Sequence, residues 1–245
     1  MVACEARRDG VGYILNGTKT FISNGGLADF YVVFAILEKS RPKTITAFLV
    51  EATNPGFQFV RPLEMSAPHP LGEIAFRDCV VPESARIGKE GEGLKLALST
   101  LDRLRATVGA AACGMAARAL DEAIHHARAR HQFGKPLADL QLIQDKIARM
   151  AIRLRASRLL VYEAAWEKDQ GAERVTLESG MAKAFATENA QTIIDDAVQI
   201  LGGRGVLKES MVDLLYRSVR ALRIYEGTTE IQHLLVAAQL LKSRA

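Results

Sequence analysis

The chain of 245 residues is long enough for one large domain or two smaller ones, each with its own apolar core. Its 49% hydrophobic and 24% charged residues are typical of globular proteins and exclude a disordered or fibrous chain. The net charge of +4 comes from Lys and Arg residues spread along the sequence, so we expect no nucleic-acid binding. No apolar run reaches the length of a membrane span, and we expect none.

The three cysteines, Cys4, Cys79 and Cys113, are odd in number and widely separated. Neither they nor the five histidines have the spacing of a metal site, so we expect reduced, mostly buried thiols and no metal. The N-terminus lacks the apolar core of a signal peptide. Together these features predict a cytoplasmic protein.

Short β-rich runs separated by turn residues fill the first third of the chain. Residues 13–15 and 18–22 flank Asn16-Gly17, a pair that accepts positive φ and predicts a hairpin turn. Further runs follow at hairpin-like spacing, at residues 30–36, 44–50, 57–60 and 74–81. This pattern predicts a small antiparallel β domain over residues 1–87.

From Gly88 onward apolar residues recur every three or four positions, the period of one helix face. The predicted helices cover residues 94–119, 140–161, 177–201 and about 229–241. Gly134-Lys135-Pro136 separates the first two, and Gly202-Gly203 ends the third. The pattern predicts an antiparallel four-helix-bundle-like domain over residues 88–245, and therefore an α+β fold that is mainly α.

Tyr225-Glu226-Gly227-Thr228-Thr229 stands just before the last predicted helix. Glycine permits close backbone approach, and threonine at a helix start caps the helix or donates to an anion. Desolvation beside Ile224 and Tyr225 would raise the pKa of Glu226 and make it a general base. On pattern alone, a solvated glutamate at a helix N-terminus is the commoner case.

The segment from Arg130 to Pro136 joins two predicted helices and combines a guanidinium, an amide and an aromatic side chain at a glycine turn. Such a set suits a planar ligand that carries phosphate, although a helix C-cap with a basic last turn explains it equally well. Gln199-Ile200-Leu201-Gly202-Gly203-Arg204-Gly205 follows a helix rather than a strand, so we reject a dinucleotide fingerprint there.

Asp102 and Arg105 lie three residues apart and face the same side of the first long helix. A surface ion pair is the simplest interpretation of this spacing. No serine stands in a nucleophile-elbow context, so the sequence offers no hydrolase triad.

In their order these segments closely resemble the acyl-CoA dehydrogenase family, over essentially the whole chain. The hairpin segment Asn16-Gly17-Thr18-Lys19-Thr20-Phe21-Ile22-Ser23-Asn24 and the strand Phe76-Arg77-Asp78-Cys79-Val80-Val81-Pro82 resemble the family's β domain. The helical part carries the similar motifs Leu101-Asp102-Arg103-Leu104-Arg105, residues 130–136 with Leu140-Gln141, residues 198–203 and residues 225–232.

The resemblance implies that FAD is the cofactor and that an acyl-CoA thioester is oxidised to a trans-2-enoyl-CoA. Glu226 would remove the α-proton, its backbone N–H would help to hold the thioester carbonyl, and flavin N5 would accept a hydride. The substrate would contact Asp102, Arg105, Tyr225 and Gly227. The implied FAD contacts, some of them across a subunit interface, are Phe21, Ile22, Ser23, Arg130, Gln132, Phe133, Leu140, Gln141, Gln199, Ile200, Leu201, Gly202, Gly203 and Thr228.

The resemblance also implies partners: an electron-transfer flavoprotein as acceptor and a homodimer or homotetramer as the assembly. Some members place the base between the aspartate and arginine of the first bundle helix, where this chain has Leu104. Phe21 stands where many members have tryptophan, and the chain opens without the N-terminal helical domain of full-length relatives. A non-catalytic or half-site partner subunit, and an oxidase or monooxygenase on the same fold, are the alternatives.

Overall fold

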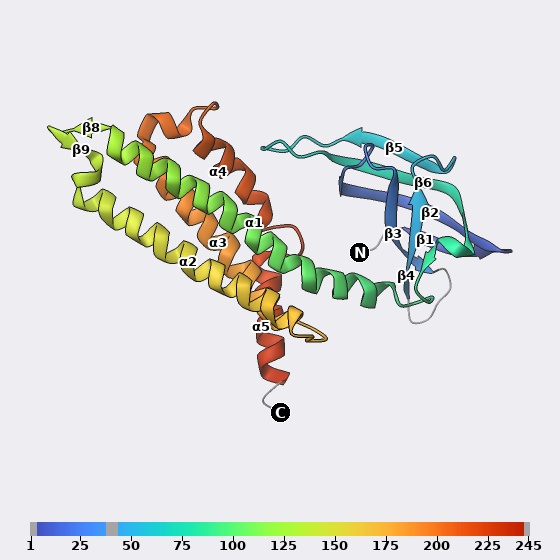
Figure 1. Ribbon diagram of the computed structural model, residues 1–245. Helices are drawn as coiled ribbons and strands as arrows, with labels where there is room; N and C mark the ends of the chain where they lie inside the picture. Colours follow the sequence, from blue (N-terminus) through green and yellow to red (C-terminus); the bar gives the residue numbers. More distant parts are fainter. Residues whose placement is uncertain (1–3, 38–43, 243–245) are drawn as a thin grey trace. The chain divides into compact units, whose positions relative to one another are not determined.

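The computed structural model of the protein describes residues 4–37 and 44–242. It divides the chain into two compact units, Met1–Ser99 and Thr100–Ala245, of which the first contains a β-sheet and the second a set of helices (Figure 1). The predicted fold class, α+β and mainly α, is confirmed. Within the described ranges no helix is both long and apolar enough to cross a membrane.

The first unit contains a seven-stranded sheet in the order β5-β6-β2-β1-β3-β4-β7. Its strands are β1 (Glu5–Asp9), β2 (Gly12–Ser23), β3 (Phe30–Leu37), β4 (Ile45–Glu51), β5 (Phe57–Pro62), β6 (Leu71–Pro82) and β7 (Arg86–Ile87). All neighbours are antiparallel except β1 and β3, which are parallel. The sheet is therefore mixed, whereas the sequence predicts an antiparallel one.

Asn16-Gly17 lies inside β2 rather than at a hairpin turn, so that prediction is wrong. The pairing of β2 with β6 shifts register at this point, and Gly17 keeps a positive φ of 139° within the resulting bulge. Asn16 Oδ1 accepts a hydrogen bond of 2.8 Å from the backbone N–H of Asp78. The tight turn lies between β1 and β2, where Gly10 has a φ of 56°.

One face of the sheet buries an aromatic and aliphatic core. Tyr13 packs edge-on against Phe48, with ring centroids 4.8 Å apart, and Phe57 stacks on Tyr31 at 4.9 Å. Glu90 accepts hydrogen bonds from the Tyr13 hydroxyl and Arg8, which fixes the segment after β7 to the sheet. The three cysteines are free and buried, as predicted.

The helices are α1 (Gly93–Ala129), α2 (Gln141–Asp169), α3 (Thr176–Leu201), α4 (Met211–Leu222) and α5 (Thr229–Lys242). The short strands β8 (His131–Gln132) and β9 (Lys135–Pro136) form a ribbon between α1 and α2. The four predicted helices and the break between the first two are confirmed. α4 lies in a segment for which the sequence patterns above predict no element, although its buried residues Val212, Val219 and Leu222 have helical spacing.

The second unit packs small residues between its long helices, which run side by side (Figure 1). Ala112, Ala116 and Ala123 of α1 are almost fully buried, and a Cβ added to Gly109 would lie 2.9 Å from Val161 of α2. Such short side chains let helix backbones approach closely. The bundle therefore has a rigid frame on which loops at its two ends are held.

Candidate active site

Glu226 lies on the loop between α4 and α5 in a backbone conformation that is unusual for its type. Its φ is 55°, and Gly227 after it has a φ of 93°. A left-handed non-glycine residue is strained by roughly 1–2 kcal/mol, so the surrounding structure must hold it there. The hydroxyl of Thr228 accepts a 3.4 Å hydrogen bond from the N–H of Ile231, so Thr228 caps the last helix as predicted.

Two fully buried side chains hold the carbonyl groups of this loop. Gln232 Nε2 donates to the backbone oxygens of Glu226 at 3.1 Å and Gly227 at 3.0 Å. Lys183 Nζ, from α3, donates to the Gly227 oxygen at 2.8 Å. A Cβ on Gly227 would lie 2.6 Å from Gln232 Nε2, so only glycine fits this position without displacing the amide.

A second group of polar contacts closes the base of the loop. Glu188 of α3 accepts hydrogen bonds from Arg223 Nε at 2.7 Å and from the Thr229 hydroxyl at 2.6 Å. The N–H of Thr229 in turn donates to the carbonyl oxygen of Arg223. Both ends of the loop are therefore fastened to the same carboxylate.

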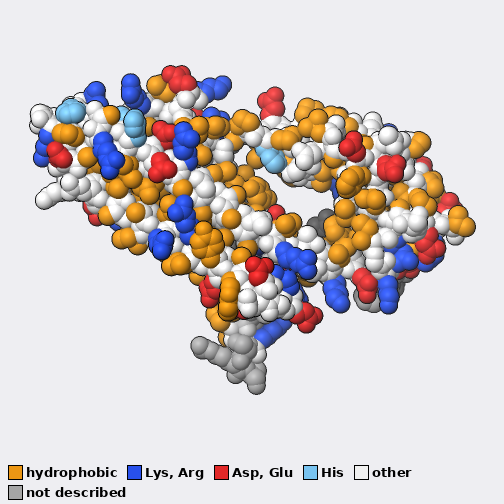
Figure 2. All heavy atoms as spheres, in the orientation of Figure 1, with side chains coloured by type: hydrophobic (Ala, Val, Ile, Leu, Met, Phe, Trp, Pro, Cys, Tyr) orange, Lys and Arg blue, Asp and Glu red, His pale blue; other side chains and the backbone are white. Residues whose placement is uncertain are grey.

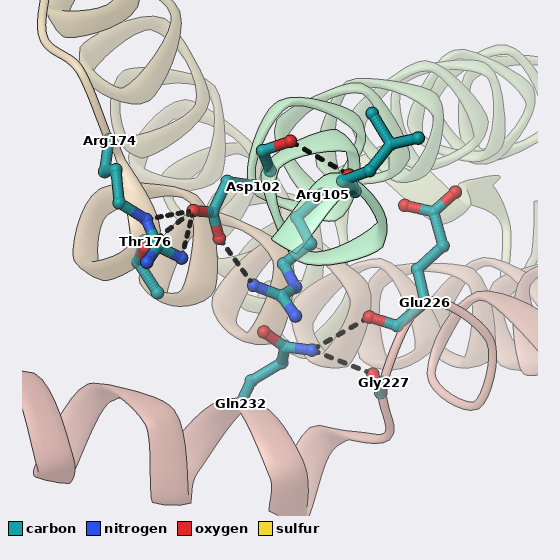
Figure 3. A network of polar contacts seen from close by, with 9 residues as sticks. Asp102, Arg105, Arg174, Thr176, Glu226, Gly227 and Gln232 are labelled. Atoms are coloured by element: carbon teal, nitrogen blue, oxygen red, sulfur yellow. Dashed lines mark hydrogen bonds and ion pairs between the residues drawn. The ribbon is translucent and has the colours of Figure 1, made fainter. Parts of the chain in front are cut away.

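Asp102 and Arg105 form an ion pair, with Nη1 and Oδ1 3.0 Å apart, but both residues are buried. The interpretation as a surface pair is therefore wrong. The other oxygen of Asp102 accepts hydrogen bonds from Arg174 at 2.9 Å and from the Thr176 hydroxyl at 2.7 Å (Figure 3). Asp102 thus joins α1, the segment before α3 and the start of α3, and it fixes the guanidinium of Arg105 near the Glu226 loop.

The carboxyl of Glu226 is half-buried, and its Oε2 atom is completely buried without a hydrogen-bond partner. Burial raises the pKa of Glu226, and the positive charges of Arg105 and Lys183 oppose this rise. Burial also lowers the pKa of Lys183 to about 8. Glu226 is therefore not the solvated helix cap that its local sequence favours.

Apart from Thr228 on the Glu226 loop, the predicted FAD contacts of the helical unit lie at a different place, near the ends of α1 and α3 and the start of α2. His126, Ala129, Arg130, Leu201, Gly203 and Arg204 line a pocket of about 440 Å³. Figure 2 shows basic and histidine side chains gathered at this end, where β8 and β9 lie. The guanidinium groups of Arg204 and Arg130 add to burial in lowering the pKa of His126, so the pocket carries a positive potential suited to phosphate.

The ribbon beyond this pocket presents an aromatic ring to solvent. Phe133 and Gly134 form its two-residue turn with φ values of 54° and 78°, and the Phe133 side chain is 88% exposed. Gln132 in β8 is exposed as well, as is Gln141 at the start of α2, and Leu140 before it is half-buried. Because β8 and β9 pair, the segment is a hairpin rather than a simple helix C-cap.

The end of α3 contributes mainly backbone. Ile200 is buried in the helical core, so its side chain is unavailable to a ligand. Gly202 has a φ of 59°, and a Cβ on Gly202 or Gly203 would meet no atom within 4 Å. Gln199 is exposed and Leu201 is half-buried. The glycines therefore leave open space beside the pocket, which fits the approach of a planar ring.

In the first unit, Phe21, Ile22 and Ser23 end β2 beside a second bulge. The register of β2 against β6 shifts between Lys19 and Ile22, and Phe21 has a φ of 59° with a side chain that is 72% exposed. The Ser23 hydroxyl lies 3.0 Å from His69 Nε2. The segment therefore presents an aromatic ring and a hydroxyl at the surface of the described residues.

Backbone strain coincides with the predicted site residues. In the described residues, five non-glycine positions have positive φ: Phe21, Asn24, Asp78, Phe133 and Glu226. Phe21 and Phe133 are predicted cofactor contacts, Glu226 is the predicted base, and Asn24 adjoins Ser23. Strain of this kind gathers at functional sites because the surrounding structure can hold it there.

Several side chains at these sites have no place in the sequence prediction, among them Thr176, Lys183, Gln232, His126, Arg204 and His69. Lys183 has a usable signal, since it falls on the apolar face of a predicted helix, three residues after Gly180 and one turn before Thr187. A charged residue on a buried face is rare unless it has a specific partner. Gln232 bonds to backbone groups five and six residues away, whereas Thr176 and His69 are 74 and 46 residues from their partners and only the fold brings them together.

The fold and these sites define a member of the acyl-CoA dehydrogenase class, and the chain belongs to that family. The family model "Acyl-CoA dehydrogenase, middle domain" matches residues 1–79, and "Acyl-CoA dehydrogenase, C-terminal domain" matches residues 91–241. The resemblance drawn from the motifs is confirmed.

Among curated relatives, the 3-(aryl)acrylate reductase of Clostridium sporogenes is 42% identical over 244 residues, which cover 98% of this chain and 64% of the relative. The mitochondrial short-chain specific acyl-CoA dehydrogenase of Rattus norvegicus is 42% identical over a match that covers 97% of this chain and 58% of the relative. The butyryl-CoA dehydrogenase structure from Megasphaera elsdenii superposes with a TM-score of 0.93 at 38% identity, over 97% of this chain and 63% of that one. The chain thus spans about three fifths of the length of these relatives.

Proposed function

We propose that this protein is an FAD-dependent dehydrogenase of acyl-CoA thioesters in which Glu226 is the catalytic base. The observation that carries the proposal is the position of Glu226, which is half-buried on a strained loop with one carboxyl oxygen completely buried and unpaired. FAD, when bound, supplies the acceptor for the hydride that leaves the β-carbon. Family membership and a similar structure entitled "FAD complex of PigA", 31% identical with a TM-score of 0.92, support this cofactor.

The electrostatics of Glu226 suit a base that takes a proton from carbon. Burial raises its pKa, so the carboxylate is a stronger base than an exposed glutamate, while the positive charges of Arg105 and Lys183 favour its ionised form. The backbone N–H of Glu226 donates to no group in the described part of the chain. It is therefore free to donate to a thioester oxygen as negative charge develops there.

The residues around Asp102 suit the substrate side of this site. Asp102 is saturated by Arg105, Arg174 and Thr176, so it orients the two guanidinium groups rather than binding substrate itself. Arg174 is mostly exposed and carries positive charge toward an anionic ligand such as a CoA thioester. Tyr225 and Gly227, on either side of the base, would line the acyl group.

The two predicted contact groups of the helical unit lie too far apart to hold one FAD molecule. Arg105 lies beside the Glu226 loop and Arg130 follows the last residue of α1, and helix geometry puts about 36 Å between these points. We infer that a second copy of the chain completes each site, with the pocket of one copy facing the flavin of the other. A homodimer or homotetramer meets this need.

The comparisons also bear on the direction of the reaction and on the redox partner. The relatives include an acryloyl-CoA reductase (NADH) from Anaerotignum propionicum, at 43% identity, in addition to dehydrogenases. The same residues would serve reduction of an enoyl-CoA, with Glu226 protonated and donating to the α-carbon. A similar solved structure is described as "Electron transferring flavoprotein of Acidaminococcus fermentans". We propose a flavoprotein of that kind as the electron acceptor.

The proposal is tested with Glu226→Gln and with Glu230→Gln as a matched control on the adjoining helix, where the side chain is exposed. Wild-type protein and the control should bind FAD and oxidise an acyl-CoA with an artificial acceptor. Glu226→Gln should keep the flavin absorbance and lose at least about a hundredfold in kcat. Turnover by Glu226→Gln equal to that of wild type would refute Glu226 as the base. A wild-type protein that binds no flavin and shows no turnover would favour a non-catalytic subunit. Oxygen consumption during turnover would indicate an oxidase or monooxygenase.

A further inference from the structure

Lys183 is a buried cation whose surroundings do not include a paired carboxylate. Its side chain on α3 is completely buried, and its hydrogen bond goes to the Gly227 carbonyl oxygen at 2.8 Å. No carboxylate in the described residues lies within ion-pair distance of its ammonium group. A buried ammonium group is unfavourable unless it is compensated, so the residue needs an explanation beyond packing.

Packing of the loop does not provide that explanation. The neutral amide of Gln232 already donates to the Gly227 carbonyl, at 3.0 Å, and to the Glu226 carbonyl as well. Lys183 adds to this a positive charge that acts on the carboxyl of Glu226. What distinguishes Lys183 from Gln232 is therefore its charge.

We propose that Lys183 is a positioning residue for Glu226, which fixes the loop through the Gly227 carbonyl and sets a buried positive charge beside the loop that carries the Glu226 carboxyl. The inference deepens the proposed function and rests on Glu226 being the base. Lys183 touches neither the carboxyl nor, by this arrangement, the substrate. It acts through the loop and through the electric field.

The other charged groups around Lys183 support this assignment. Glu188 on α3 is already engaged by Arg223 and Thr229, and Glu230 at the start of α5 is exposed. Arg105 of α1 pairs with Asp102, repels Lys183 and acts on the pKa of Glu226 in the same direction as Lys183. Glu226 is the remaining carboxylate, its Oε2 atom has no hydrogen bond, and it contributes most among the charges that oppose the lowering of the Lys183 pKa.

The test compares three variants of the full chain. Lys183→Met removes the charge and the donor, Lys183→Gln removes the charge and keeps a donor, and Gln232→Met removes two loop contacts without changing charge. Titration of the Glu226 carboxyl is followed by ¹³C NMR on glutamate-labelled protein, with the resonance identified by its absence in Glu226→Gln. Hydrogen exchange at the loop amides reports positioning, and neither measurement depends on turnover.

We expect both Lys183 variants to move the titration midpoint of Glu226 to higher pH, because a nearby positive charge favours the ionised carboxyl. Gln232→Met should speed amide exchange in the loop and leave the midpoint unchanged. The acid limb of the kcat/KM profile should follow the midpoint, and kcat should fall about tenfold or more in Lys183→Met.

An unmoved midpoint in both Lys183 variants, or the same shift in Gln232→Met, would overturn the inference. Because Lys183→Gln retains a donor, it decides the question if Lys183→Met fails to fold. A shifted midpoint in the Lys183 variants, together with a wild-type protein that turns over no acyl-CoA, would refute the proposed function and leave the role of Lys183 intact. Normal turnover with an unmoved midpoint would refute the role of Lys183 alone.

Discussion

Replacing Lys183 with methionine should stabilise the helical unit near neutral pH, even though it harms the site. The pKa of Lys183 is lowered from its ordinary 10.5 to about 8, so near pH 7 the folded chain holds the ammonium form at a cost of about 3 kcal/mol relative to the unfolded chain. Methionine matches the stem of lysine, carries no charge and loses one hydrogen bond, worth about 1 kcal/mol. The Gly227 carbonyl keeps its bond from Gln232, so it is not left unpaired. The net gain in the free energy of unfolding near pH 7 is therefore about 2 kcal/mol.

The pH dependence of this gain has a definite sign. Below about pH 8 the folded chain holds a buried ammonium group, and the full penalty applies to the wild-type protein. Between about pH 8 and 10.5 the folded lysine loses its proton while the unfolded one keeps it, so wild-type stability rises relative to the variant. The advantage of Lys183→Met should therefore shrink through this window and be absent above it.

Urea unfolding followed by the fluorescence of Trp166, the single tryptophan, reports on the helical unit because Trp166 lies in α2. The matched control is Lys168→Met, since Lys168 also donates to backbone carbonyl oxygens, those of Ala172 and Glu173, but is only half-buried. It should give no gain in stability. A Lys183→Met protein that is less stable than wild type near pH 7, or whose difference from wild type is independent of pH, would refute the reasoning.

Three further changes test other parts of the structure. Asp102→Asn should lower the free energy of unfolding of the helical unit by about 3 kcal/mol, because the buried guanidinium of Arg105 loses its counter-charge. Urea unfolding followed by Trp166 fluorescence measures this loss, and an unchanged urea midpoint would contradict it. Gly227→Ala should reduce kcat at least about tenfold and lower stability by about 1 kcal/mol, because its φ is 93° and the added Cβ meets Gln232; wild-type kinetics would disprove the close fit. Phe21→Gly should relieve about 1 kcal/mol of backbone strain, so the sheet should melt no lower than in wild type, while flavin absorbance of the purified protein falls; full flavin content would exclude Phe21 from the cofactor site.

Much of the fold follows from local patterns, and the errors arise where distant residues decide. Apolar periodicity predicts α1, α2, α3 and α5 because each helix buries one continuous face. Asn16-Gly17 fits a hairpin and a bulge equally well, since both accept positive φ. The hydrogen bond from Asp78, 62 residues away, accompanies the bulge, and no local window contains that information.

The candidate site was only partly visible in the sequence for the same reason. The Glu226 loop stands out by its glycine and threonines, but its burial comes from side chains on α1, α3 and α5. A spacing of three places Asp102 and Arg105 on one helix face without indicating whether that face is buried. Their burial depends on Arg174 and Thr176, more than 70 residues away, which close over the carboxylate.

The separation between the Glu226 loop and the Arg130 pocket has a genetic consequence. If each complete site takes the loop from one chain and the pocket from another, a substitution in the loop inactivates only the sites that use that loop. A substitution in the pocket likewise inactivates only the sites that use that pocket. Mixed assemblies of a Glu226→Gln chain and a chain altered at Arg130 would then contain some sites built from two intact halves. Two inactive proteins would complement each other when they are folded together, and the recovered activity would follow the statistics of subunit mixing.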